Sequence, residues 1–251
     1  MFDFQSQIIF PTHAVWAPGP LPRGSERVQI AAGNGDQLHG VHISPRRKSA
    51  GARTLILGFA GNAWNSEDAA TFLHKVYPDA DIIVFHYRGY RPSTGSPSAE
   101  ALMDDAPRVY DFAVSRVKAE RTIAVGLSIG SGIAANLAAE RPVDGLILVT
   151  PFDSLKTVAS DQYPYLPVGL LFRHDIDAAS ALKRSKVPTA IIAGADDTLI
   201  TPRRTDALRA SVGNLVFDLT IRGAGHNDIY HHPQFHPAMH EALDALSEAK
   251  A

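Results

Sequence analysis

The stretch Thr122-Ile123-Ala124-Val125-Gly126-Leu127-Ser128-Ile129-Gly130 decides the fold of this chain. It opens with a short apolar run, typical of a strand buried on both faces, and the small-residue run Ser131–Glu140 that follows favours a helix. Ser128 therefore stands at the tight turn between strand and helix, where Gly126 and Gly130 avoid side-chain collisions. Such a turn is typical of a nucleophilic serine, and a glycine-rich turn with an inert serine is the alternative.

Working outward, similar apolar runs predict the neighbouring strands, and the segments between them predict helices. The strand runs are Thr54–Leu57, Asp81–Phe85, Thr122–Val125, Gly145–Val149, Thr189–Ala193 and the more alternating Leu215–Leu219. The helical segments are Ser66–Tyr77, Ser98–Lys118, Ser128–Glu140, Pro202–Ala210 and His236–Ala249.

Two alternating segments near the start, Arg27–Ile30 and Leu38–Ile43, flank Gly33-Asn34-Gly35-Asp36 and predict a β-hairpin. The hairpin followed by strand–helix units predicts an α/β fold. We expect an eight-stranded, mostly parallel sheet with an N-terminal antiparallel hairpin and helices on both faces.

The length of 251 residues suits one large α/β domain, and we expect residues 1–251 to form it. The segment 153–180 lies between two predicted strands and is too long for a simple crossover. We therefore predict a small lid or cap insertion after the sixth strand, in which Tyr163 and Tyr165 bind substrate. A helix with a long irregular approach is the alternative.

The amino-acid composition limits the classes of partner and site that we expect for this protein. The formal net charge is -2, which provides no general basic field for nucleic acid. There are no cysteines, so disulfides, a thiol nucleophile and thiolate metal sites are excluded. The start of the chain lacks a signal-peptide pattern, and no apolar run approaches the roughly 20 residues that span a bilayer. We expect a cytoplasmic protein with a small-molecule acyl substrate and no membrane span, and its oligomeric state is left open.

A serine nucleophile needs a base, and the base needs a carboxylate to orient it. The expected chain order is serine, acid, histidine. Asp196 and Asp197 both follow the strand Thr189–Ala193, and Asp153 follows Gly145–Val149. These three acids are the candidates for the carboxylate that orients the base. His226 lies in a glycine-flanked loop after the last strand and is the expected base.

More histidines follow closely: His231, His232, His236 and His240. Their spacing fits no metal-hydrolase motif, and prolines interrupt the start of the helix that carries the last two. A solvated helix start is the preferred interpretation, and we expect neither a metal nor another cofactor.

Acyl transfer also needs two backbone N–H groups that stabilise the oxyanion. Ile129, directly after the candidate nucleophile, is expected to supply one. The loop after Thr54–Leu57 is expected to supply the other, with Asn62 as the donor and Ala60 or Ala63 as alternatives. Trp64 in the same loop adds bulk that narrows the pocket, so we assign it to substrate binding.

Four segments together resemble the Bem46-like branch of the α/β-hydrolases, close to serine aminopeptidase S33-type and ABHD13-like hydrolases. They are Ala60-Gly61-Asn62-Ala63-Trp64-Asn65, Tyr87-Arg88-Gly89-Tyr90 with Gly95-Ser96-Pro97, the acid segment Gly194–Pro202, and Gly223-Ala224-Gly225-His226-Asn227-Asp228. The resemblance spans about residues 26–245 and aligns Asp197, rather than Asp196, with the family's acid. Ala60 replaces a histidine of the family pattern, and Thr201 stands where its proline is usual.

The resemblance implies an α/β-hydrolase fold and a Ser128–His226–Asp197 triad. The expected function is that of a serine hydrolase that cleaves a carboxylic ester or related acyl bond of a small apolar substrate through an acyl-enzyme. A peptidase, thioesterase or acyltransferase with the same triad is the alternative, and a non-catalytic binding protein of this fold is a third hypothesis.

Overall fold

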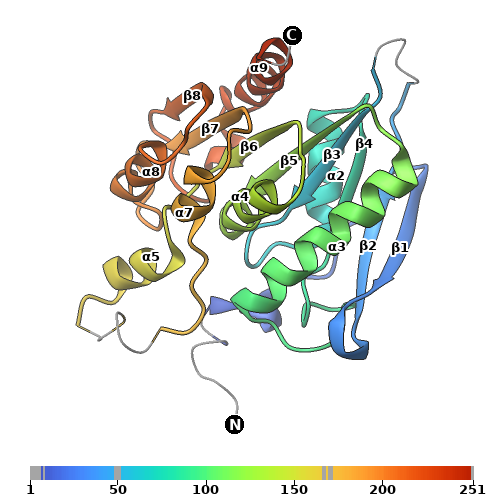
Figure 1. Cartoon of the computed structure of the whole chain (residues 1–251), viewed down its shortest axis with the longest axis horizontal. Helices are drawn as coiled ribbons and strands as arrows, with labels where there is room; N and C mark the ends of the chain where they lie inside the picture. Colours follow the sequence, from blue (N-terminus) through green and yellow to red (C-terminus); the bar gives the residue numbers. More distant parts are fainter. Residues whose placement is uncertain (1–6, 8, 48–51, 166–167, 169–171, 250–251) are drawn as a thin grey trace.

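The computed structural model describes residues 7, 9–47, 52–165, 168 and 172–249. Their centre is an eight-stranded sheet with the order β1-β2-β4-β3-β5-β6-β7-β8 (Figure 1). The strands are β1 (Ser25–Ala31), β2 (Gln37–Ile43), β3 (Thr54–Phe59), β4 (Asp81–Phe85), β5 (Arg121–Leu127), β6 (Gly145–Val149), β7 (Thr189–Gly194) and β8 (Leu215–Ile221).

The sheet is mostly parallel, as the sequence predicts. Only the β1–β2 and β2–β4 pairs are antiparallel. The hairpin turn contains Asn34 and Gly35, whose φ angles of 62° and 80° lie in the left-handed region that this turn requires. All other neighbours in the sheet run parallel, so the carboxyl ends of β3, β5, β6, β7 and β8 share one edge.

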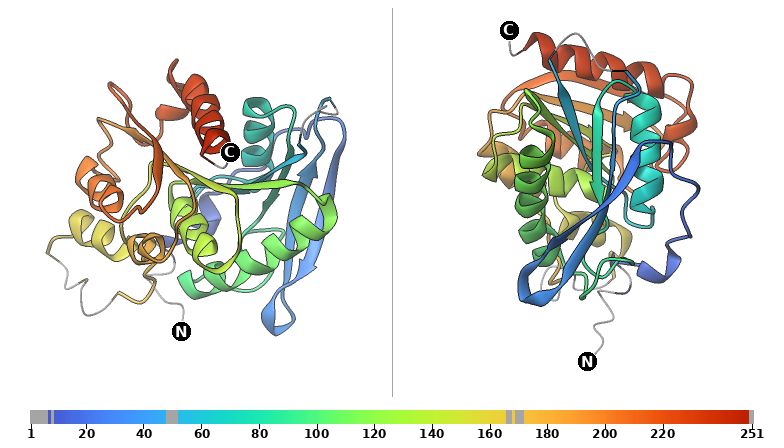
Figure 2. Two further views of the ribbon diagram at one scale, coloured as in Figure 1. Left: turned by 45° about the horizontal axis from the view of Figure 1, so that its top comes forward. Right: turned by 90° about the vertical axis from the view of Figure 1, so that its right-hand side faces the viewer.

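Helices cover both faces of the sheet, which confirms the predicted fold class. The helices are α2 (Ser66–Val76), α3 (Ala99–Val117), α4 (Ile129–Glu140), α5 (Leu155–Gln162), α7 (Ala178–Lys183), α8 (Pro202–Arg209) and α9 (Phe235–Glu248). In Figure 2 (left), α2 and α9 lie together on one side of the strands, and α3 and α4 lie on the other. The sheet is therefore the middle of three layers.

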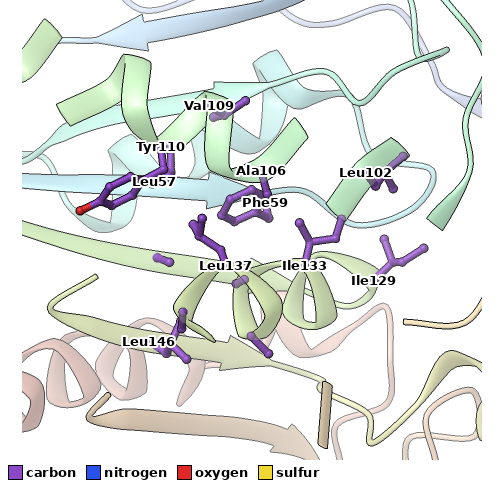
Figure 3. Packing of buried hydrophobic residues seen from close by; sticks show 14 of the residues in the cluster. Leu57, Phe59, Leu102, Ala106, Val109, Tyr110, Ile129, Ile133, Leu137 and Leu146 are labelled. Atoms are coloured by element: carbon purple, nitrogen blue, oxygen red, sulfur yellow. The ribbon is translucent and has the colours of Figure 1, made fainter. Parts of the chain in front are cut away.

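The alternation of side chains along the strands builds a separate core on each face. In β3, Leu55 and Leu57 belong to the cluster that packs under α3 and α4, whereas Ile56 belongs to the cluster under α2 and α9. Figure 3 shows Ile133 and Leu137 of α4 on the first of these faces, with Phe59 of β3 beside them. This packing fixes β3, β5 and α4, the elements that flank Ser128 and the loop Ala60–Asn65.

The two ends of the segment 153–180 lie side by side. An isolated bridge pairs Ser154 with Asp177 near its two ends. Between them lies α5, a helix that the sequence did not separate from its surroundings, and α7 then packs against α4. Residues 166–167 and 169–171 of this segment lie outside the described residues.

Within the described part of the chain, no helix is both long and apolar enough to cross a membrane.

Candidate active site

Ser128 lies between β5 and α4 in a backbone conformation that residues other than glycine rarely adopt. Its φ is 54° and its ψ is -118°, a strained combination for a residue with a Cβ. The two flanking glycines are required by close backbone approach. A Cβ on Gly126 would lie 2.5 Å from the Gly130 carbonyl oxygen, and one on Gly130 would overlap the Phe59 carbonyl. The turn therefore pushes the Ser128 hydroxyl out at the carboxyl edge of the sheet.

A continuous hydrogen-bonded chain starts at that hydroxyl. Ser128 Oγ lies 2.9 Å from His226 Nε2, and His226 Nδ1 lies 2.7 Å from Asp197 Oδ2. The three side chains come from the loops after β5, β7 and β8, which the parallel sheet brings to one edge. Asp197 and the His226 ring are both largely buried, so water does not compete for the bond between them.

The structure also separates the three acids that the sequence offered. Asp197 Oδ1 accepts hydrogen bonds from the backbone N–H groups of Leu199 (2.9 Å) and Ile200 (2.7 Å), which leaves Oδ2 aimed at His226. Asp196 is exposed. Asp153 accepts a hydrogen bond from the Thr157 hydroxyl and pairs with Arg204 instead.

The loop after β3 lies against the serine. A Cβ on Gly61 would come within 3.9 Å of Ser128 Cβ, so the backbone just before Asn62 is close to the turn that carries Ser128. The Asn62 side chain is fixed at both ends. Its Oδ1 accepts a 2.7 Å hydrogen bond from the Tyr90 hydroxyl, and its Nδ2 donates to the Ile9 carbonyl.

The neighbouring Ala60 is held through its backbone. Its carbonyl accepts a 2.8 Å hydrogen bond from the Tyr87 hydroxyl. Burial raises the pKa of both Tyr87 and Tyr90 far above the phenol's usual value, so both remain hydrogen-bond donors at all working pH values. The two tyrosines thus take over the support of this loop.

Ile129, the other predicted oxyanion donor, is the first residue of α4. The N–H groups of a helix's first turn have no acceptor within the helix. The amino end of α4 also carries partial positive charge, which favours an anion at this point.

A cleft of about 790 Å³ opens over Ser128. Its lining includes Trp64, as predicted from the sequence, but neither Tyr163 nor Tyr165. These two tyrosines follow the end of α5 and are 46% and 97% exposed. Their role in substrate binding stays a prediction.

Several residues of the cleft were missed by the sequence analysis. They are Phe72, Lys75, Leu199, Asn227, Tyr230, His231 and His236. Trp64, Phe72 and Tyr230 form a mutual aromatic cluster with ring centroids 5.1–5.9 Å apart. Phe72 is only partly buried in the structure, and the sequence alone does not separate it from the core residues of the helix Ser66–Val76.

The histidine-rich segment does not converge on a metal site. Among the residues that the structure describes, no group of three or more histidine, aspartate or glutamate side chains is placed to hold an ion. His240 packs its ring against Tyr77, and His232 Nδ1 accepts a hydrogen bond from the Gln234 N–H. His231 and His236 instead line the cleft.

Comparison with known proteins agrees with this architecture. A family described as the alpha/beta hydrolase fold matches residues 55–169, which include Ser128. The uncharacterised protein Rv2307c of Mycobacterium tuberculosis is 29% identical over 215 residues, covering 84% of this chain and 75% of that protein. The lysophosphatidylserine lipase ABHD12 of Danio rerio is 28% identical over 204 residues, covering 73% of this chain and 51% of that protein.

Among solved structures, the esterase Pf2001 of Pyrococcus furiosus superposes with a TM-score of 0.71 at 17% identity, over 92% of this chain and 96% of the esterase. At this identity the likeness concerns the fold. The chain thus has the α/β-hydrolase fold, which the solved structures share and which the family match over residues 55–169 also describes.

Proposed function

We propose that this chain is a serine hydrolase that cleaves carboxylic esters, with Ser128, His226 and Asp197 as its catalytic triad. The observation that carries the proposal is the 2.9 Å contact between Ser128 Oγ and His226 Nε2, backed by the 2.7 Å contact of His226 with Asp197. Within the superfamily, the motifs around Asn62 and Tyr87 favour the Bem46-like, ABHD13-like branch.

The mechanism follows from this geometry. His226 Nε2 accepts the Ser128 proton as Oγ attacks the ester carbonyl, and Asp197 holds Nδ1–H and stabilises the imidazolium. The backbone N–H groups of Ile129 and Asn62 stabilise the oxyanion. His226 then protonates the leaving alcohol, the C–O bond breaks, and an acyl-Ser128 remains. Water, deprotonated by His226, hydrolyses this acyl-enzyme and restores the serine.

We further propose that residues 153–180 are a cap on a single catalytic domain that spans residues 1–251. Two contacts at the end of α5 support this. Gln162 Nε2 donates to the Thr198 and Leu199 carbonyls, both at 3.1 Å, and Leu199 lines the cleft. Asp161 pairs with Arg204 of α8 at 3.2 Å. The cap thus meets the rim of the cleft beside the loop that holds the acid.

A fluorophosphonate probe tests the triad, because it labels only an activated serine. The wild type is expected to label and to hydrolyse p-nitrophenyl esters. Ser128→Ala abolishes labelling, whereas His226→Gln and Asp197→Asn reduce its rate by at least about 10³-fold. The exposed neighbour provides the matched control, since Asp196→Asn leaves the rate within twofold. An unlabelled wild type, or equal labelling of Ser128→Ala, contradicts the proposal.

A further inference from the structure

The cleft over Ser128 has two chemically different parts. Next to the serine its walls are aromatic and apolar, built from Trp64, Phe72 and Tyr230. Farther along, its lining includes Lys75 and His236. A ligand that fills the whole cleft therefore meets an apolar surface first and cationic or protonatable nitrogen groups after it.

A chain of contacts gives the order of these parts. Gly61 lies beside both Ser128 and Trp64, since a Cβ there would be 3.9 Å from each. The Trp64 ring centroid lies 5.2 Å from that of Phe72, and Phe72 lies 6.0 Å from His236. The path from the nucleophile to His236 therefore crosses two aromatic rings in succession.

Lys75 stands at the same far part of the cleft. It lies three residues after Phe72 on α2, so the two side chains share a face of the helix. Lys75 is exposed, and within the described residues it makes no ion pair. An ammonium group that lines a cleft and has no carboxylate of its own is available to a ligand.

The charge balance of the cleft points the same way. Among the described residues that line it are one lysine, Lys75, and three histidines, His226, His231 and His236, and no aspartate or glutamate is present. The chain as a whole has a formal net charge of -2, so the cleft is more positively charged than the protein is overall. Such a local field attracts anions to a cleft of this kind.

We propose that the natural substrate is an amphiphilic ester that carries an anionic group, a carboxylate or phosphate, beyond an apolar spacer. The spacer lies across Trp64 and Phe72, and Lys75 and His236 bind the anionic group. This rests on the proposed ester hydrolysis at Ser128. A volume of about 790 Å³ accommodates such a molecule, whereas a short acyl group alone would leave most of the cleft unfilled.

Pairs of esters that differ only in the distant charge test this proposal. On the acyl side, mono-p-nitrophenyl suberate is compared with p-nitrophenyl octanoate. On the alcohol side, the acetate ester of an ω-hydroxyoctanoic acid is compared with octyl acetate. We expect kcat/KM to favour the anionic member of at least one pair by roughly tenfold, with the preference falling as salt is added. The pair that responds identifies which side of the ester occupies the cleft.

Charge reversal at Lys75 isolates its contribution. Lys75→Glu is expected to lower the anionic-to-neutral ratio of kcat/KM by roughly tenfold and Lys75→Met by about threefold. Lys183→Glu is the matched control, because Lys183 is also an exposed lysine in the last turn of a helix but lies away from the cleft. It is expected to leave the ratio unchanged.

Two outcomes overturn the inference while leaving the ester hydrolysis intact: a ratio near one for both pairs, or equal ratios in Lys75→Glu and Lys183→Glu. If no ester is turned over and Ser128 does not label, the proposed function fails, and binding then decides the inference. Calorimetry with Ser128→Ala compares monomethyl suberate with dimethyl suberate. Tighter binding of the monoanion, lost in the added Lys75→Glu, supports the anion site, and equal or absent binding of both excludes it.

Discussion

The Tyr90 hydroxyl donates a 2.7 Å hydrogen bond to Asn62 Oδ1, and so joins the loop after β4 to the loop after β3 beside the serine. The family pattern has a histidine at the position of Ala60 in that loop. Here the Tyr90 contact, together with the Tyr87 bond to the Ala60 carbonyl, orders the backbone that we assign to the oxyanion.

Removal of the Tyr90 hydroxyl tests this support. We expect Tyr90→Phe to lower kcat by roughly tenfold with little change in KM, because the Asn62 N–H loses its fixed position in the transition state. Tyr110→Phe is the control, since Tyr110 donates a comparable 3.0 Å bond to the Pro142 carbonyl away from the site. Both variants should lose about 1 kcal/mol of unfolding free energy. Equal kcat values in the two variants would contradict a positioning role.

The strained backbone of Ser128 predicts that a glycine variant at this position is more stable than an alanine variant. Because φ is 54° at this residue, a glycine relieves strain that an alanine retains. We expect Ser128→Gly to be more stable to urea than Ser128→Ala by about 1 kcal/mol. Ser131, inside α4, supplies the comparison, where the glycine variant should be the less stable by about the same amount. The same order at both positions would contradict strain at Ser128.

The close approach of Gly130 to β3 predicts a large cost for one methyl group. A Cβ there meets the carbonyls of Phe59 and Ala60, which are backbone atoms and cannot move aside cheaply. We expect Gly130→Ala to lower the unfolding free energy by about 2–4 kcal/mol. In Gly213→Ala the nearest atom, the Ser185 carbonyl oxygen, is 3.5 Å away, and this variant should stay within about 1 kcal/mol of wild type.

His86, at the end of β4, predicts a dependence of stability on pH. Burial lowers the pKa of His86 to about 4, whereas an unfolded histidine titrates near 6.5. The unfolded chain therefore binds a proton first, and native stability falls as the pH drops from about 6.5 to 4. His86 alone should lower the free energy of unfolding by about 2 kcal/mol between pH 7 and pH 5.

Urea unfolding at these two pH values measures the effect of His86. Between pH 7 and pH 5, His86→Gln should lose about 2 kcal/mol less unfolding free energy than the wild type does. His13→Gln, at an exposed histidine, should lose as much as the wild type. An identical pH dependence in His86→Gln and wild type would show that His86 does not titrate in this way.

The sheet was accessible to sequence analysis because its strands are buried on both faces. Asp81–Phe85 and Gly145–Val149 are continuous apolar runs, and the structure has strands at these bounds. The elements that were missed are α5, inside the segment 153–180, and α7, which begins at its end. Val158 is the only buried residue in α5, so this helix leaves little apolar periodicity in the sequence.

The hydrogen-bonded chain was accessible for a different reason. Parallel strands bring their carboxyl ends to one edge, so the order serine, acid, histidine along the chain predicted a convergence of Ser128 with His226, and the family resemblance selected Asp197 among three acids. The helical part of the cleft wall was not accessible, because it comes from the outer surfaces of α2 and α9. The side chains of Phe72 and Lys75 look like ordinary helix surface until α9 is placed beside α2.

The bridge between Ser154 and Asp177 has a consequence for how this protein can change over evolutionary time. Since the two ends of the insertion already meet, the sheet and the Ser128 turn do not depend on how many residues lie between them. Lengthening, shortening or replacing that segment changes what lies beside Leu199 at the rim of the cleft, while Ser128, His226 and Asp197 stay in place. New substrate ranges can therefore arise here by insertion and deletion, without a single change in the strands.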